Sequence, residues 1–361
     1  MNMISKKGNI IFPFLAELKP NIQTYRSKYA AEFIWLAVGQ FLTLLLSFIS
    51  IKYLTSIGPK DYGLFVLLTS LTSLASSIYF NPFEQSYVRY LFENSSADDQ
   101  QKMFLRKFLS GIARSVGLTF MLFLCIAAFS HFSSIGKNYV SVAAIVVIVL
   151  PLANQPITGM LNALRLRKTV AMIQVTEKAI QVMLFIFISK FVTLTLSLVF
   201  QTIGLVFLTS LLLRLYFIRK YCVGIQTPHN ARSQLLAPTL PQQLFHFMLP
   251  FIIWGIFGGL QMNGERWIVE SIMTTSEVGR YGLAFSLISS TAVVSNTIVS
   301  QFFLPFIYKA FSSKEESRQQ EGKKLIAIYR WSIIVIFVGF ACLFGFLGDD
   351  VIRLVSTKDF S

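Results

Sequence analysis

Nine apolar segments, each about as long as a bilayer is thick, constrain this chain more than any other feature. A transmembrane helix needs about 20 mostly apolar residues. The segments that meet or approach this length are Ala31–Leu54, Gly63–Phe80, Phe104–Phe129, Val140–Ala163, Ala171–Ser189, Thr193–Ile218, Phe247–Arg266, Gly282–Pro305 and Leu325–Leu347. Each run is continuous rather than alternating, which excludes a membrane β-barrel. The sequence predicts an all-α membrane protein, a polytopic bundle of about nine transmembrane helices.

The composition supports the same class of protein. Of the 361 residues, 54% are hydrophobic and only 14% are charged, whereas soluble domains carry about 25% charged residues. The net charge of +15 would suggest a nucleic-acid partner in a soluble protein. Here the basic residues fall between the apolar runs and form no stripe. We therefore expect contact with anionic membrane lipids and no nucleic-acid binding.

The distribution of basic residues predicts the orientation of the chain. If the N-terminus is cytoplasmic and the segments alternate, 23 of the 32 Lys and Arg residues face inward, Arg214 among them, and 8 face outward. An excess of positive charge marks the cytoplasmic side. We expect a multi-pass protein of the bacterial inner membrane with a cytoplasmic N-terminus.

An internal repeat divides the chain into two lobes. Tyr62-Gly63-Leu64 follows the first apolar segment and Tyr281-Gly282-Leu283 follows the seventh, 219 residues later. Repeated helix bundles with a site between them are a common plan of transporters. The predicted parts are a cytoplasmic N-terminal segment (1–29), a first six-helix lobe (30–218), a cytoplasmic linker (219–246) and an incomplete second lobe of three helices (247–361).

The fifth apolar segment carries the most informative polar residues. Gln174, Glu177, Lys178 and Gln181 follow the spacing i, i+3, i+4 and i+7, which places them on one helical face. One interpretation is a stripe that lines a central cavity, with Lys178 in contact with a phosphate. The other is an adjacent acid and base near the cytoplasmic end, with Lys178 extending to the lipid headgroups.

The fourth and first segments also contain polar groups. In the fourth segment, polar residues recur every four positions at Asn154, Thr158 and Asn162, and the same segment contains Pro151 and Pro156. They are candidates for a cavity wall, or for hydrogen bonds between helices. Gln40 lies deep in the first segment and is expected to face the interior.

Two arginines are further candidates for anion contact. Arg266 ends the seventh segment, where Gln261 and Glu265 share a face, and a guanidinium group suits phosphate oxygens. Its alternative role is an interfacial anchor beside Trp267. Arg89 follows the second segment and either guards the inner mouth or is a loop charge.

The sequence contains none of the common motifs of catalysis, metal binding or nucleotide binding. It lacks HExxH, the nucleophile elbow and GxxxxGK[ST]. We therefore expect no catalytic residues, no cofactor and no metal, and transport that is not driven by ATP on this chain.

Three stretches resemble the polysaccharide-biosynthesis branch of the multidrug/oligosaccharidyl-lipid/polysaccharide flippase superfamily. They are Ile51–Gly63 (IKYLTSIGPKDYG), Leu161–Lys168 (LNALRLRK), and Gly264–Ile268 (GERWI) followed by Ser276–Tyr281 (SEVGRY). Their order and topology extend the likeness over nearly the whole chain from residue 30. Members of this family usually have twelve or more helices, so the chain resembles a C-terminally shortened member.

The resemblance implies a flippase that moves a polyprenyl-pyrophosphate-linked oligosaccharide (an undecaprenyl-pyrophosphate glycan) to the outer leaflet by alternating access. The product would serve O-antigen, capsule or exopolysaccharide synthesis, with polysaccharide assembly proteins as further candidate partners.

A multidrug exporter of the same superfamily is the first alternative, but it would need an acid in its pocket, and Glu177 has Lys178 beside it. A membrane glycan polymerase is the second, and the large outward loop expected for it is absent.

Overall fold

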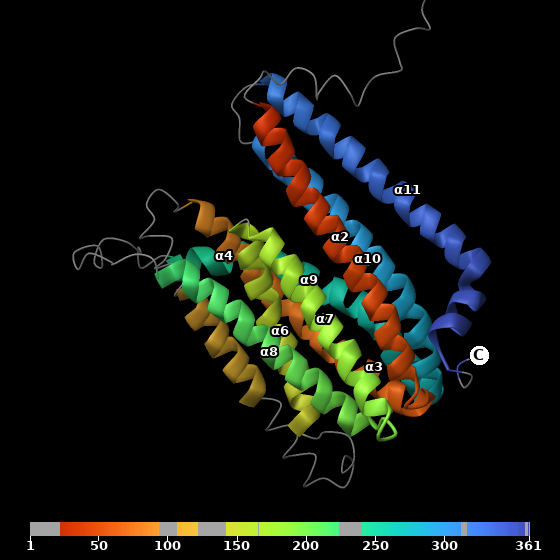
Figure 1. The fold of residues 1–361 in the computed structure, drawn as a ribbon. Coiled ribbons are helices and arrows are strands. Elements are labelled where there is room, and N and C mark those ends of the chain that lie inside the picture. The colour runs from red at the N-terminus through yellow and green to blue at the C-terminus, as the bar shows by residue number, and fades with distance from the viewer. Residues whose placement is uncertain are drawn as a thin grey trace, which may run out of the picture.

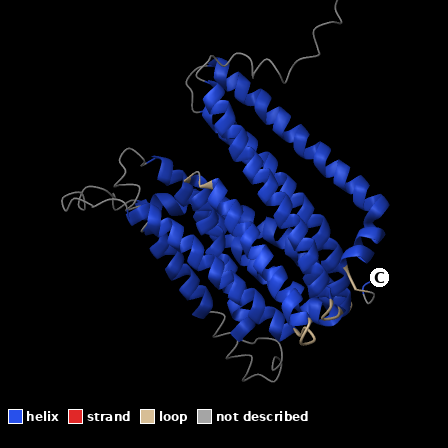
Figure 2. Ribbon diagram, in the orientation of Figure 1, coloured by secondary structure: helices blue, strands red, loops and turns tan. Residues whose placement is uncertain are grey.

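The computed structural model describes residues 22–93, 107–121, 142–164, 166–223, 240–311, 316–357 and 360. These residues form helices joined by short turns, and no strand occurs among them (Figure 2). The elements are α2 (Ile22–Thr55), α3 (Pro59–Ala75), the π-helix η1 (Ser76–Phe80), α4 (Asn81–Glu93), α6 (Val142–Ala163), α7 (Arg167–Ser189), α8 (Leu196–Val223), α9 (Leu240–Ile272), α10 (Thr275–Phe311) and α11 (Glu316–Val355). Residues 107–121 are also helical.

Seven of these helical stretches are long and apolar enough to span a bilayer, which confirms the all-α polytopic class. They are Ala37–Thr55, Pro59–Arg89, Arg167–Ser189, Leu196–Lys220, Gln243–Ile272, Thr275–Ser300 and Glu316–Val355. The other two predicted segments, Phe104–Phe129 and Val140–Ala163, lie partly outside the described residues. Their described parts are helical.

The second predicted segment is wrong in length. Instead of ending at Phe80, the helix runs without a break from Pro59 through η1 and α4 to Glu93. Pro82 has no N–H for the carbonyl of the residue four positions before it, and the helix widens to π geometry at Ser76–Phe80, where lost helix hydrogen bonds are commonly absorbed. The segment is therefore one long helix with a π-helical interruption.

The turns that carry the internal repeat are as short as the sequence predicts. Ser56, Ile57 and Gly58 join α2 to α3, and two residues join α9 to α10. Gly58 has φ 91°, a left-handed value that residues with a Cβ rarely adopt. Pro59 follows in the first turn of α3, where its missing N–H is not needed.

The helices pack in pairs that join distant parts of the sequence (Figure 1). α2 packs on α7, α6 on α8, α3 on α10, and α4 with η1 on α9. α11 lies along α10 at the edge of the bundle. The two predicted lobes thus meet through α2, α3, η1 and α4 of the first lobe and α9, α10 and α11 of the second.

The predicted terminal segment and linker contain more helix than expected. α2 begins at Ile22, within the predicted segment 1–29, and residues 1–21 lie outside the described residues. α8 continues to Val223 and α9 begins at Leu240, so both extend into the predicted linker, whose residues 224–239 are not among those described.

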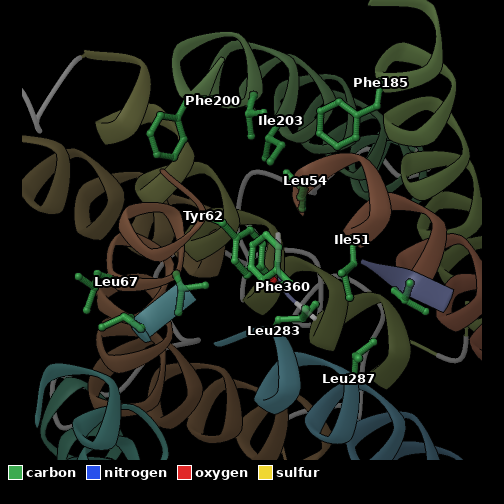
Figure 3. Close-up of a cluster of buried hydrophobic side chains, with 14 residues drawn as sticks. Ile51, Leu54, Tyr62, Leu67, Phe185, Phe200, Ile203, Leu283, Leu287 and Phe360 are labelled. Carbon is green, nitrogen blue, oxygen red and sulfur yellow. The ribbon is translucent and has the colours of Figure 1, made fainter. Parts of the chain in front are cut away.

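Two apolar clusters occupy opposite ends of α7. One gathers residues of α2, α3, α7, α8 and α10 near the repeat turns (Figure 3), including Tyr62, Phe185 and Leu283. The other gathers residues of α4, α6, α7, α8, α9 and the helical stretch 107–121, including Phe83 and Val170. The polar residues of α7 and the serines of α3 lie between these clusters along their helices.

Candidate functional site

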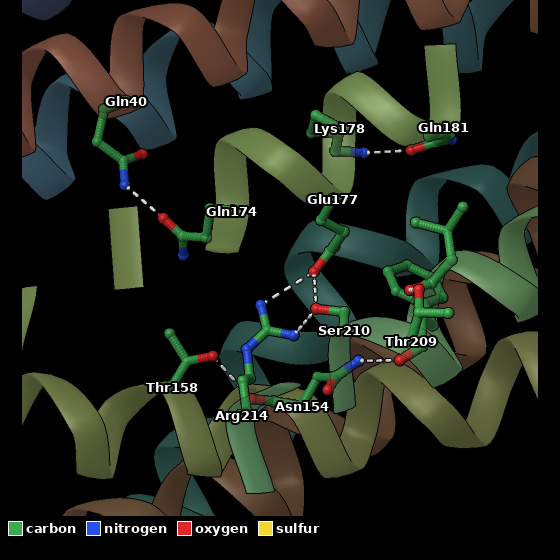
Figure 4. Close-up of polar contacts among 12 residues, drawn as sticks. Gln40, Asn154, Thr158, Gln174, Glu177, Lys178, Gln181, Thr209, Ser210 and Arg214 are labelled. Carbon is green, nitrogen blue, oxygen red and sulfur yellow. Dashed lines mark hydrogen bonds and ion pairs between the residues drawn. The ribbon is translucent and has the colours of Figure 1, made fainter. Parts of the chain in front are cut away.

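The predicted polar stripe of α7 is divided between different neighbours (Figure 4). Gln174 accepts a hydrogen bond of 3.0 Å from Nε2 of Gln40, which joins α7 to α2. Glu177 points instead toward α8. Regular spacing places the four residues within one broad sector of the helix, and the close packing of α2 and α8 on α7 assigns them to separate contacts.

A buried ion pair occupies the α7–α8 contact, with Nη2 of Arg214 3.0 Å from Oε2 of Glu177. Ser210 donates to the same carboxylate oxygen and accepts from Nη1 of Arg214. The two charged side chains are only 5% and 12% exposed. Arg214, which the sequence analysis counted only among the inward-facing charges, thus lies within α8, where Glu177 supplies its counter-charge.

Lys178 has a neutral partner. Its Nζ donates a hydrogen bond of 3.0 Å to Oε1 of Gln181, one turn along α7, and it forms no ion pair with any residue that the structure describes. Gln181 is buried. An amide oxygen is an uncharged acceptor and offers an ammonium group no counter-charge.

The amides of α6 join that helix to α8. Asn154 is buried and donates through Nδ2 to the backbone carbonyl of Phe207 at 3.1 Å. Its Oδ1 and the Oδ1 of Asn162 are buried and have no hydrogen-bond partner. Thr158 bonds back to the carbonyl of Asn154 at 2.8 Å. Asn154 thus serves helix packing, and the two carbonyl oxygens retain free hydrogen-bonding capacity.

Arg266 lies in α9, facing α10. Its guanidinium carbon is 4.6 Å from the centre of the Phe285 ring, and its Nε is buried without a hydrogen-bond partner. The neighbouring Glu265 accepts a hydrogen bond from the Tyr281 hydroxyl, so the repeat motif of α10 engages the acid beside Arg266. Gln261 is exposed on the same helix.

Arg89 is part of a helix, not of a loop. It lies in α4, within the span Pro59–Arg89, with its guanidinium carbon 4.4 Å from the centre of the Phe247 ring of α9. The interpretation of Arg89 as a loop charge is therefore wrong. Stacking on Phe247 fixes the arginine at the contact between α4 and α9, the two helices on opposite sides of the predicted lobe boundary.

A second polar group surrounds η1, and the sequence analysis did not include it in the site. Ser76 donates to the Gln155 side chain, and Gln155 donates to the Asn81 side chain. Farther along α3, Ser73 accepts from Asn263 at 3.2 Å and Ser70 from Trp267 at 3.0 Å. The sequence feature that could have indicated this group is the run of serines on α3 and η1, which here face amide side chains of α6 and α9.

Two hollows of the described structure lie away from these groups. One of about 250 Å³ lies between α10 and α11, beside Asp349, and another of about 500 Å³ lies along α11. Neither is lined by a residue that the sequence analysis placed in the site. No group of three His, Cys, Asp or Glu residues suited to a metal ion occurs within the described ranges.

An all-helical bundle with seven membrane-spanning stretches and charged groups paired between its helices defines a multi-pass membrane protein. The sequence profile of the family described as polysaccharide biosynthesis protein matches residues 29–311. The match covers most of the chain, so the chain belongs to this family. No curated protein and no solved structure matches the chain. The family assigns the chain to polysaccharide biosynthesis at the membrane.

Proposed function

We propose that the protein moves a polyprenyl-pyrophosphate-linked oligosaccharide from the cytoplasmic to the outer leaflet of the bacterial inner membrane. The observation that carries this proposal is the presence of two basic side chains within the spans that have no acidic partner among the described residues. Glu177 is paired with Arg214, whereas Lys178 and Arg266 form no ion pair with a described residue. Cations at bilayer depth are costly and mark substrate pathways. A pyrophosphate group matches their charge, and its isoprenoid tail can remain in the lipid.

The contact between the repeat turns supports alternating access. The first turns of α3 and α10 cross at Gly63 and Gly279, each at the start of a repeat unit. With the N-terminus in the cytoplasm, this crossing lies at the outer face of the membrane and closes it. In this proposal the lobes exchange the closed arrangement for an outward-open one during transport.

Replacing Lys178 or Arg266 with alanine is expected to reduce export of the lipid-linked glycan by about ten- to hundredfold, since loss of one charge-assisted hydrogen bond costs about 1.5–3 kcal/mol. Export would be measured in a strain that lacks its own polysaccharide flippase, by lectin or antibody staining of surface glycan. Protein in the membrane fraction would be quantified in parallel.

The matched control is Arg280→Ala, because Arg280 is exposed and pairs with Glu277 at 2.9 Å. Lys178→Arg should restore export, since it keeps the positive charge. Wild-type glycan levels in both alanine variants, at equal protein levels, would remove these residues from the substrate path.

One observation favours a second candidate function, a cation-coupled multidrug exporter. Glu84 has no cationic partner among the described residues, and a free acid within the spans is suited to a cationic drug. Drug susceptibility of the same strains distinguishes the two. Restored resistance without restored glycan would favour the exporter, whereas restored glycan alone would favour the flippase.

A further inference from the structure

The π-helical interruption is held in place by the neighbouring helix. Gln155 of α6 accepts from Ser76 at the start of η1 and donates to Asn81 directly after it. One amide thus bridges the two ends of the wide turn. π-Helical turns within α-helices occur frequently at functional sites, and here the turn also contacts α9, where a Cβ at Gly255 would overlap with the Ser77 carbonyl.

Glu84 lies one turn beyond Asn81, on the same face of α4. It meets α6 at Gly159, which is itself one turn beyond Gln155. A Cβ added at Gly159 would overlap with the Glu84 carboxyl group. The absence of a side chain at Gly159 therefore makes the space that the carboxyl group occupies. The pairs Asn81–Glu84 and Gln155–Gly159 form one continuous contact between α4 and α6.

The Glu84 carboxyl group forms no ion pair and no hydrogen bond with a described residue. None of the charged or titratable groups on the elements packed around Glu84 forms an ion pair or hydrogen bond with it in the described structure. α6 carries none between Val142 and Ala163. Arg89 stacks on Phe247, and the Tyr79 hydroxyl bonds Ser115 at 2.9 Å. The remaining groups near this end are Tyr87, Lys107, Arg114 and His246.

We propose that Glu84 is the proton-binding carboxyl group that couples transport to a proton gradient. This inference rests on the proposed function as a transporter. In each cycle an O–H bond forms at a carboxylate oxygen with a proton from the water on one side of the membrane. The same bond breaks when the site opens to the other side, so the gradient is the only co-reactant.

The geometry explains how proton binding would bias the helices. An ionised carboxylate without a counter-charge is costly at bilayer depth, and the neutral acid can pack against the α6 backbone at Gly159. Proton binding therefore favours the arrangement in which α4 and α6 touch, and proton loss favours their separation. No group of three His, Cys, Asp or Glu residues occurs in the part of the chain that the structure describes, and the test with sodium below distinguishes a proton from a metal ion at Glu84.

The first test is chemical modification of the full-length protein in lipid nanodiscs. Dicyclohexylcarbodiimide attacks protonated carboxylic acids in apolar surroundings, and mass spectrometry locates the adduct. We expect an adduct at Glu84 whose formation rate falls by about tenfold for each pH unit above the pKa of that group. Glu177 serves as the internal control and should remain unmodified, because its carboxyl group is held in an ion pair with Arg214 and is only 12% exposed. Glu84→Gln removes the adduct.

The second test measures lipid-linked glycan transport in proteoliposomes with and without an imposed pH gradient. Wild type should be accelerated by the gradient, and Glu84→Gln should transport at one rate in both conditions. Gly159→Ala displaces the carboxyl group and should reduce the acceleration. Gly264→Ala is its matched control, because a Cβ there meets no atom within 4 Å.

The outcomes separate this inference from the proposed function. No adduct at Glu84 at any pH, protection of Glu84 by sodium at constant pH, or an unchanged response of Glu84→Gln to the gradient would each overturn it. If wild type moves no glycan, the proposed function fails. The modification test would then still decide whether Glu84 binds a proton.

Discussion

Arg214→Ala is expected to lower the free energy of unfolding by about 3–5 kcal/mol, because it leaves the buried Glu177 carboxylate without its counter-charge. Arg214 and Glu177 are 5% and 12% exposed and join α7 to α8. Ser210 cannot compensate, since a hydroxyl group donates one hydrogen bond and carries no charge. Chemical unfolding in detergent micelles, followed by tryptophan fluorescence, would measure the change.

The control is a double-mutant cycle. Replacing Glu177 and Arg214 together with Leu and Met removes both charges, and we expect this double variant to be about as stable as wild type. The exposed pair Glu277–Arg280 provides the matched comparison, where loss of the arginine should cost no more than about 1 kcal/mol. Equal losses at the two pairs, or additive losses within the buried pair, would contradict the structural assignment.

The sequence predicts the positions of most helices, because apolar runs of bilayer length have few other solutions in a chain with 14% charged residues. It fails where polar residues continue a helix. Asn81, Pro82 and Glu84 end the second apolar run, yet the helix continues to Glu93. Gln155 supplies the hydrogen bonds that make this continuation possible, and it lies on α6, far away in the sequence.

The candidate site is predicted less completely, for a related reason. Helical spacing places the polar residues of α7 on one face of the helix, but spacing does not state which neighbour each residue meets. Glu177 finds Arg214 in the next helix, while Gln174 finds Gln40 in α2. The Glu84 carboxyl group can pack against α6 only because residue 159 is glycine. These relations depend on packing between helices, which the sequence pattern does not contain.

The crossing of α3 and α10 is tight enough that a single methyl group should change it. A Cβ at Gly63 would overlap with the Thr275 carbonyl and lie 3.1 Å from the Gly279 nitrogen. A Cβ at Gly279 would overlap with the Pro59 carbonyl and lie 3.2 Å from the Gly63 nitrogen. The obstructing atoms belong to the backbone, so no change of rotamer relieves the overlap, and the helices must separate.

We therefore expect Gly63→Ala and Gly279→Ala each to destabilise the closed crossing by about 1–3 kcal/mol, which raises the population open at this end by about tenfold.

Val278, fully buried in wild type, reports the opening when changed to cysteine in a chain whose Cys125, Cys222 and Cys342 are serine. A membrane-impermeant maleimide added to cells should label it about tenfold faster in either variant. Gly339→Ala, with open space around its Cβ, should not change the rate. Because one methyl group already separates the helices, the double variant should cost less than the sum of the single changes. Labelling as slow as in Gly339→Ala would show that this crossing does not hold the outer side closed.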